Sequence, residues 1–115
     1  MSTATVLLIS ALPADKANEL LHVNVVAPTM LARAAVPGMI ARGGGTIINV
    51  AGMLAFGAAA PLGAAAGRAT YVATLAHLVA LSQALHEELA RQGVQVQVLC
   101  PGVVATEFHE RQGMD

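Results

Sequence analysis

Three short apolar runs separated by two long helix-like segments constrain this chain more than any other feature. The runs lie at residues 5–10, 46–51 and 94–100, and the segments between them lie at residues 14–43 and 69–92. Short β-branched runs are typical of buried strands. Strands that alternate with long helices pair in parallel through right-handed crossovers. We therefore expect one β-α-β-α-β unit over residues 1–115, a three-stranded part of a doubly wound α/β sheet.

Several residues suggest where the first helix begins, bends and ends. Asp15 is a plausible N-cap, and Pro28 removes a backbone donor inside the helix. Pro37 is expected to restart a last turn, which ends at Gly43 to Gly45. The helix is expected to turn one apolar face inward, formed by Leu20, Leu21, Val25, Met30 and Leu31.

The last apolar run alternates in a way that predicts a half-buried strand. Val94, Val96 and Val98 should face one way, and Gln95 and Gln97 should face the other. If both helices cover the same side of the sheet, the other side would leave Val6, Leu8, Ile48, Val50 and Val98 bare. Exposed apolar surface of this kind implies a partner or aggregation.

Composition excludes some function classes. The formal net charge is −1 and aromatic residues make up 3% of the chain, so neither a basic stripe nor a base-stacking platform is present and we expect no nucleic-acid binding. Residues 43–67 carry no charge and could span a bilayer by length, but glycines and Pro61 break the stretch, so we expect no membrane segment. The single cysteine, Cys100, fits a reducing cytoplasmic setting.

Four motifs together resemble one enzyme family. They are the Tyr71-Val72-Ala73-Thr74-Leu75 segment, the Cys100-Pro101-Gly102 turn, the Ile48-Asn49-Val50-Ala51-Gly52 run and the His22-Val23-Asn24-Val25 run. In this order and spacing, they are similar to the C-terminal half of a short-chain dehydrogenase/reductase, a Rossmann-like fold. The likeness covers residues 16–115 and does not include the family's N-terminal dinucleotide-binding half.

The resemblance implies a site and a cofactor. Tyr71 would be the catalytic proton donor, and Asn24 would help to order a water. The nicotinamide of NAD(P) would meet the rim formed by Pro101, Gly102, Val104 and Thr106. The family's phosphate-binding glycine turn follows a strand, whereas Gly43 to Gly45 precede one, so binding of NAD(P) by this chain alone is doubtful.

Two positions depart from the family pattern in a way that bears on chemistry. The family's lysine, four residues after the tyrosine, is replaced by Leu75, and its catalytic serine falls on Gly52. A free tyrosine has a pKa of about 10, so it is a poor acid–base at neutral pH unless a nearby cation lowers that value. Loss of an oxyanion donor costs about 10²–10³ in rate. We expect little or no independent activity.

Three functions remain open at this point. The chain is a truncated or decayed NAD(P)-dependent oxidoreductase, or a non-catalytic interaction module, or one half of a complementing enzyme. As a module it would dimerise through its two long helices, with itself or with an intact relative. His22, His77, His86 and His109 show no metal-ligand spacing, so we expect no metal site.

Overall fold

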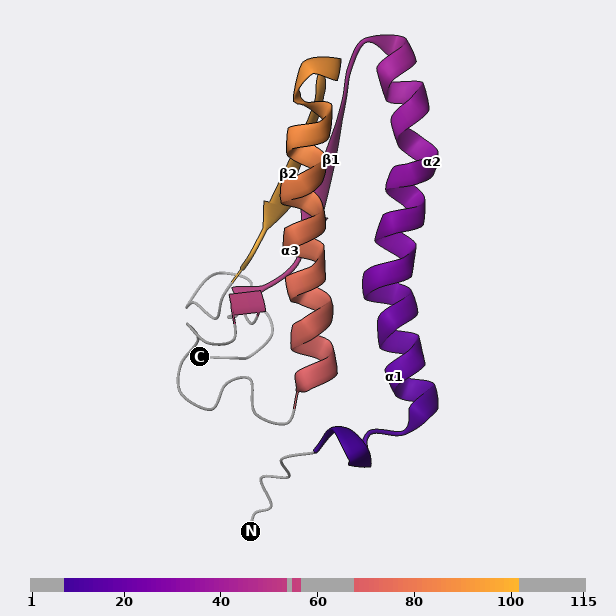
Figure 1. The fold of residues 1–115 in the computed structure, drawn as a ribbon, viewed down its shortest axis with the longest axis vertical. Helices are drawn as coiled ribbons and strands as arrows, with labels where there is room; N and C mark the ends of the chain where they lie inside the picture. Colours follow the sequence, from indigo (N-terminus) through magenta and orange to yellow (C-terminus); the bar gives the residue numbers. More distant parts are fainter. Residues whose placement is uncertain (1–7, 54, 57–67, 102–115) are drawn as a thin grey trace, which may run out of the picture.

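The computed structural model describes residues 8–53, 55–56 and 68–101, which form two parallel strands covered on one side by helices (Figure 1). The helical elements are α1 (Ala14–Leu21), a π-helical turn (His22–Val26), α2 (Ala27–Arg42) and α3 (Ala69–Leu89). The strands are β1 (Gly45–Val50) and β2 (Val94–Leu99). Single 3-10 turns lie at Ile9–Ala11 and Ala90–Gln92. The α/β class and the parallel pairing expected from the sequence are confirmed.

The two strands pair in register from Gly45 with Val94 to Val50 with Leu99. Their connection is α3, the crossover helix that a parallel pair requires. Beyond the strands, the ladder continues through a hydrogen bond from Ala51 N to the Leu99 carbonyl at 2.7 Å. The ends of both strands are therefore held side by side where the candidate site lies.

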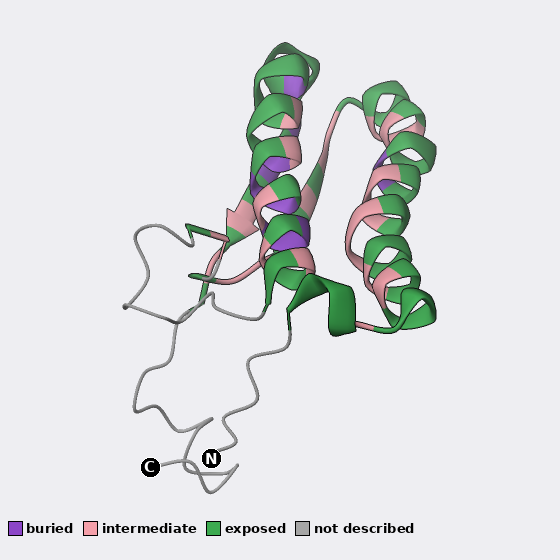
Figure 2. Ribbon diagram, turned by 60° about the horizontal axis from the view of Figure 1, so that its bottom comes forward, coloured by how far each residue is buried: buried purple, intermediate pink, exposed green. Residues whose placement is uncertain are grey.

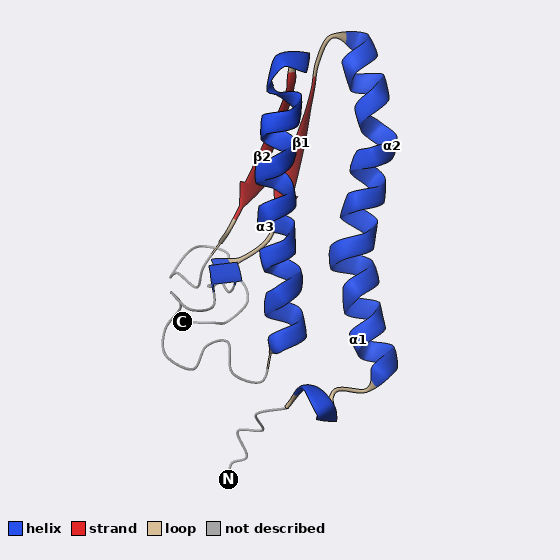
Figure 3. Cartoon of the chain, viewed as in Figure 1, coloured by secondary structure: helices blue, strands red, loops and turns tan. Residues whose placement is uncertain are grey.

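Each strand is entered through a glycine with a left-handed backbone. Gly43, with φ of 84°, ends α2, and Gly93, with φ of 78°, follows the 3-10 turn after α3. The two glycines lie against each other, because a Cβ built on Gly93 would be 2.7 Å from the Gly43 carbonyl oxygen. The starts of β1 and β2, which follow these glycines, lie side by side (Figure 3).

The predicted strand at residues 5–10 is wrong in the part that is described. Ile9–Ala11 is a 3-10 turn in which Ala11 N donates to the Leu8 carbonyl at 2.8 Å. No strand pairs with this segment among the described residues, so local hydrogen bonds satisfy its backbone instead. Residues 5–7 lie outside the described residues, and the described sheet has two strands.

The first long helix differs from its prediction at two points. Pro13 occupies the N-cap position and Asp15 lies in the first turn, so Asp15 is not the cap. Pro37 lies inside α2 without ending it. The disturbance predicted at Pro28 is present, because the π turn His22–Val26 lies directly before α2. A proline at position 28 removes the donor for the Asn24 carbonyl.

That π turn also changes which apolar residues face inward. A π turn holds more residues than an α turn, so later positions are rotated relative to an uninterrupted helix. Leu20 and Val25 are half-buried as predicted, but Leu21 and Met30 are exposed and Leu31 is 70% exposed. The inward face of α2 is formed by Ala32, Val36 and Met39.

The core lies between α3, α2 and the inner face of the sheet. Leu89, Val94 and Val96 form its centre, with Val36, Met39, Ile47 and Leu85 packed against it. Figure 2 shows that the buried residues of α3 lie along its inward side. The alternation predicted for β2 is confirmed, because Val94 and Val96 are buried and Gln95 and Gln97 are exposed.

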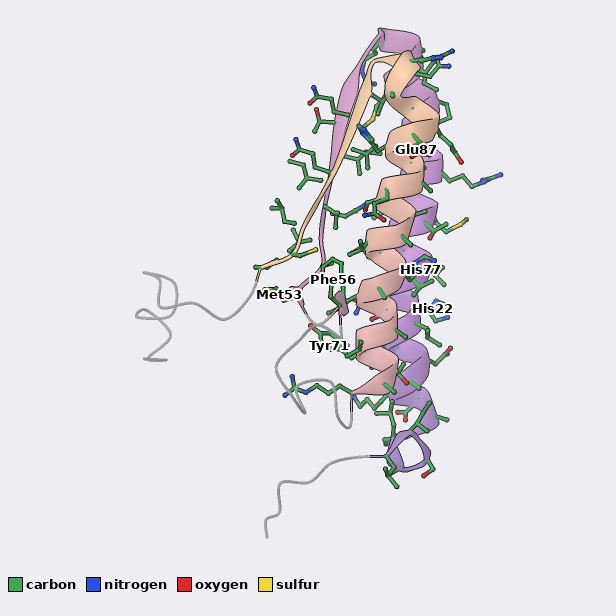
Figure 4. The ribbon with its side chains drawn as sticks, turned by 60° about the vertical axis from the view of Figure 1, so that its left-hand side comes forward. His22, Met53, Phe56, Tyr71, His77 and Glu87 are labelled. Carbon is green, nitrogen blue, oxygen red and sulfur yellow. The ribbon has the colours of Figure 1, made fainter. Side chains whose placement is uncertain are left out.

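The opposite face of the sheet is uncovered by the described elements. Ile48 is 55% exposed, and Val50 and Leu99 are exposed to a similar extent. Val98 was expected on this face, but it is half-buried on the side of Val94 and Val96. Figure 4 shows both long helices on the same side of the strands.

Candidate active site

Tyr71 lies in the first turn of α3, near the ends of the two strands. It is 38% exposed, and its backbone carbonyl accepts a hydrogen bond from the Thr74 hydroxyl at 2.6 Å. Figure 4 shows Tyr71 at the same end of the molecule as Met53 and Phe56, whose side chains are exposed. The phenol therefore lies at an open, apolar end of the sheet.

Asn24 is brought to the same helical turn from a distant part of the sequence. Its Nδ2 donates to the Thr74 hydroxyl at 3.0 Å, so an amide, a hydroxyl and the Tyr71 carbonyl form one hydrogen-bonded chain. The structure thus places both predicted catalytic residues around Thr74. Thr74 itself, which is 1% exposed, was missed by the sequence reasoning. The sequence feature that could have identified Thr74 is a hydroxyl residue on the inward face of α3, one turn after the tyrosine.

Gly52 and Leu75, the two departures from the family pattern, lie against each other. A Cβ built on Gly52 would be 3.4 Å from Leu75 Cδ1 and 3.9 Å from the Pro101 carbonyl oxygen. Leu75 is 5% exposed. A hydrocarbon side chain therefore packs where the family pattern calls for a hydroxyl beside an ammonium group.

Lys16 and Arg68 are the two cations that the sequence analysis could compare with the missing lysine. Lys16, the only lysine, lies on exposed α1 with its Nζ 3.9 Å from Glu19 Oε2. Arg68 is exposed at the start of α3, where its carbonyl accepts a hydrogen bond from Val72 N at 2.8 Å. No salt bridge of Arg68 was found within the described ranges.

The predicted cofactor rim is described at one residue. Pro101 is exposed, and its carbonyl accepts a hydrogen bond from Met53 N at 3.1 Å, which extends the strand ladder. Gly102, Val104 and Thr106 lie outside the described residues. Contact of this rim with NAD(P) stays a prediction.

A second polar chain ties β1 to the middle of α3. Asn49 Nδ2 donates to the Ser82 hydroxyl at 2.9 Å, and that hydroxyl donates to the Leu78 carbonyl at 2.7 Å. The arrangement repeats that of Asn24 and Thr74, with an amide from one element bonded to a hydroxyl on α3. Sequence reasoning did not identify either hydroxyl, since a serine or threonine inside a helix carries no motif by itself.

The remaining reactive side chains show no common site. In the part of the chain that the structure describes, no group of three or more His, Cys, Asp or Glu side chains could hold a metal ion. His22, His77 and His86 are exposed, and Cys100 is a half-buried free thiol. His109 lies outside the described residues.

Comparison with known proteins identifies the family. The model of the short chain dehydrogenase family matches residues 3–115, so the chain belongs to this family. The Dehydrogenase/reductase SDR family member 4 of Oryctolagus cuniculus is 36% identical over 91 residues, which are 79% of this chain and 33% of that protein. The chain thus spans about a third of the length of the curated relatives that it matches.

Two further comparisons bear on the site. A short-chain dehydrogenase from Sphingobium yanoikuyae, solved in complex with NADPH, has a TM-score of 0.74 and 34% identity, covering 93% of this chain and 40% of that one. An Inactive 2-(S)-hydroxypropyl-CoM dehydrogenase 2 from Xanthobacter autotrophicus is 34% identical over 93 residues, which are 81% of this chain and 38% of that protein. The Rossmann-like origin of the fold is therefore shown.

Proposed function

We propose that this chain is an NAD(P)-dependent oxidoreductase by descent that does not catalyse hydride transfer on its own. The observation that carries the proposal is the contact between Gly52 and buried Leu75. Proton donation to a carbonyl needs an acid, and the developing oxyanion needs a hydrogen-bond donor. Glycine and leucine supply neither, so Tyr71 lacks the serine and the lysine that assist the tyrosine in the family.

Cofactor binding tests this proposal directly. Ligands raise the stability only of states that they bind. We therefore expect the Tm of the purified chain to stay unchanged in a large excess of NADP(H) or NAD(H), with no NADPH oxidation in the presence of aldehydes and ketones. An intact family member measured under the same conditions is the positive control. A cofactor-dependent rise in Tm together with turnover that Tyr71→Phe abolishes would overturn it.

A second function, a non-catalytic interaction module, is supported by the outer surface of α2. Together with the π turn before α2, this surface carries the exposed apolar side chains of Val23, Val26, Met30 and Leu31. Exposed apolar patches of this kind mark interaction sites. A homodimer, or a complex with an intact relative, would bury them against the same helices of the other copy.

Light scattering after size-exclusion chromatography tests whether the chain self-associates through this surface. We expect Met30→Lys to shift the chain toward monomers, because a charge would be buried at the helix contact. Arg33→Lys is the matched control, since it changes an exposed residue on the same helix and keeps its charge. Assembly that is equally strong in both variants would exclude the outer surface of α2 as the interface.

The length of this helix also raises the question whether it crosses a membrane. The helix Ala14–Arg42 has 29 residues, and an 18-residue window of it reaches a mean hydropathy of 1.3, so by length and composition it could cross a membrane. It contains Arg33, and its inward face packs Val36 and Met39 against the core. We propose instead that this helix packs against the sheet and that the chain is cytoplasmic. Retention of the chain in the supernatant after sedimentation with lipid vesicles is the expected result.

A further inference from the structure

We infer that His77 makes the helix-mediated dimer sensitive to pH: two copies associate through α3 while this histidine is neutral and separate when it is protonated. The dimer is the one proposed above as an interaction module, so its regulation rests on that function. His77 is exposed near the middle of α3, and Figure 4 shows it on the side of the helix that faces away from the strands.

His77 belongs to a row of exposed residues along α3. Ala73, His77, Ala80 and Ala84 are all exposed and follow one another by three or four positions, which places them on one face of the helix. The buried residues of α3, such as Leu78, lie on the other side. The imidazole is therefore the one large and titratable side chain in an otherwise short-chained row.

The charges of α3 make a second copy of the same helix its complementary partner. Arg68 lies at the N-cap position, and the carboxylates of Glu87 and Glu88 lie in the last turn, with all three residues exposed. A twofold interface places the same patch of both copies face to face. Two antiparallel α3 helices therefore bring the guanidinium of each copy to the carboxylates of the other, and such complementary charges fix the register.

One antiparallel register satisfies the row and the charges together. Its residue pairs across the twofold axis are His77 with Ala80, Ala73 with Ala84, and Arg68 beside Glu88. Alanines let the two helices approach to about 8 Å, the short end of the usual range. The imidazole of each copy then lies over an alanine of the other.

This register brings the two imidazoles close to each other at the axis. With position 77 opposite position 80, the two His77 residues are offset by about 4.5 Å along the helix direction. Two imidazolium groups there repel each other, and each loses hydration on burial, which disfavours the charged form. The separated copies therefore bind more protons than the dimer, so a fall in pH favours separation.

The charged groups around His77 within one copy narrow the choice of sensor. The elements that pack against α3 are α1, the π turn, β2 and the 3-10 turn Ala90–Gln92. Their charged or titratable residues are Asp15, Lys16, Glu19, His22 and Arg91, and all of them are exposed. Lys16 and Glu19 pair with each other at 3.9 Å. Histidines change charge between about pH 5 and 8, so His22 is the one competing sensor on these elements.

Sedimentation velocity at about pH 8 and about pH 5.5 tests the inference, with circular dichroism as the check on folding. We expect the dimer Kd of the unmodified chain to rise about tenfold or more at the lower pH. His77→Gln has a neutral side chain and should dimerise equally at both pH values. The matched controls are His22→Gln, on the π turn, and His86→Gln, on α3 outside the row, and both should keep the pH response.

The outcomes separate this inference from the module on which it rests. A dimer with the same Kd at both pH values, or with the same pH response after His77→Gln, overturns the inference and leaves the module in place. A chain that is monomeric at both pH values overturns the two together.

Charge exchange tests the register independently. Arg68→Glu should weaken the dimer at about pH 8, because it sets like charges beside each other at both ends of the helix pair. Arg68→Glu/Glu88→Arg restores opposite charges and should restore the dimer. A double variant that dimerises no better than the single variant would overturn the antiparallel arrangement.

Discussion

At the scale of single residues, Thr74 has the largest structural role beside Tyr71. Its hydroxyl accepts from Asn24 and donates to the Tyr71 carbonyl, and it is almost fully buried. Removing one partner from buried polar groups costs about 1–3 kcal/mol. We expect Thr74→Val to lower Tm by several degrees in a thermal melt. Thr74→Ser keeps the hydroxyl and should retain most of the stability. An equal loss in both variants would show that the methyl group, and not the hydroxyl, matters.

Leu75 gives a second residue-scale prediction. It is buried against the position of Gly52, so a lysine there would lose packing and bury an ammonium group. We expect Leu75→Lys to destabilise the chain by about 2–5 kcal/mol in urea unfolding. Leu75→Met is the volume-matched control and should cost less than about 1.5 kcal/mol. A stable Leu75→Lys variant would mean that the old lysine site is still hydrated and open.

At the scale of elements, the two left-handed glycines differ in what surrounds them. A Cβ on Gly43 would meet nothing within 4 Å, whereas a Cβ on Gly93 would clash with the Gly43 carbonyl. Gly43→Ala should therefore cost only the strain of a left-handed residue, about 1–2 kcal/mol. Gly93→Ala should cost clearly more, because the contact that aligns the strands must open. Equal ΔG values from urea unfolding would contradict this account.

The elements also show what the sequence could predict. Both α3 and β2 were predicted nearly to their ends, because Gly93 and the valine–glutamine alternation are strong local signals. The inward face of α2 was predicted incorrectly, because Pro28 induces a π turn whose rotation cannot be read from helical spacing. The strand at residues 5–10 failed where Ile9–Ala11 is described, since an apolar run forms a strand only if a neighbour pairs with it.

The sequence named residues for the candidate site but could not give their geometry. The motifs pointed to Asn24, Gly52, Tyr71 and Leu75. That Gly52 and Leu75 touch depends on how α3 packs over the ends of the strands, which is tertiary information. The link through Thr74 was missed because it joins residues 50 positions apart.

At the scale of the whole molecule, one face of the sheet is packed and the other is uncovered by the elements that the structure describes. Ile47 packs against the core and its neighbour Ile48 is mostly exposed. We expect Ile47→Lys to cost about 2–5 kcal/mol of unfolding free energy. Ile48→Lys should cost less than about 1 kcal/mol and should increase solubility, because it interrupts an exposed apolar surface. Urea unfolding and the concentration at which the chain precipitates provide the two readouts.

The crossover between β1 and β2 has a consequence for how quickly the chain reaches this structure. Partners such as Gly45 and Val94 are separated by roughly 50 residues, so the sheet forms only after a large loop has closed. Helix formation takes about a microsecond or less, far faster than pairing of distant strands in parallel. We expect α3 to form early and the β1–β2 ladder late, which leaves the residues of β2 unpaired with β1 while each molecule is still folding.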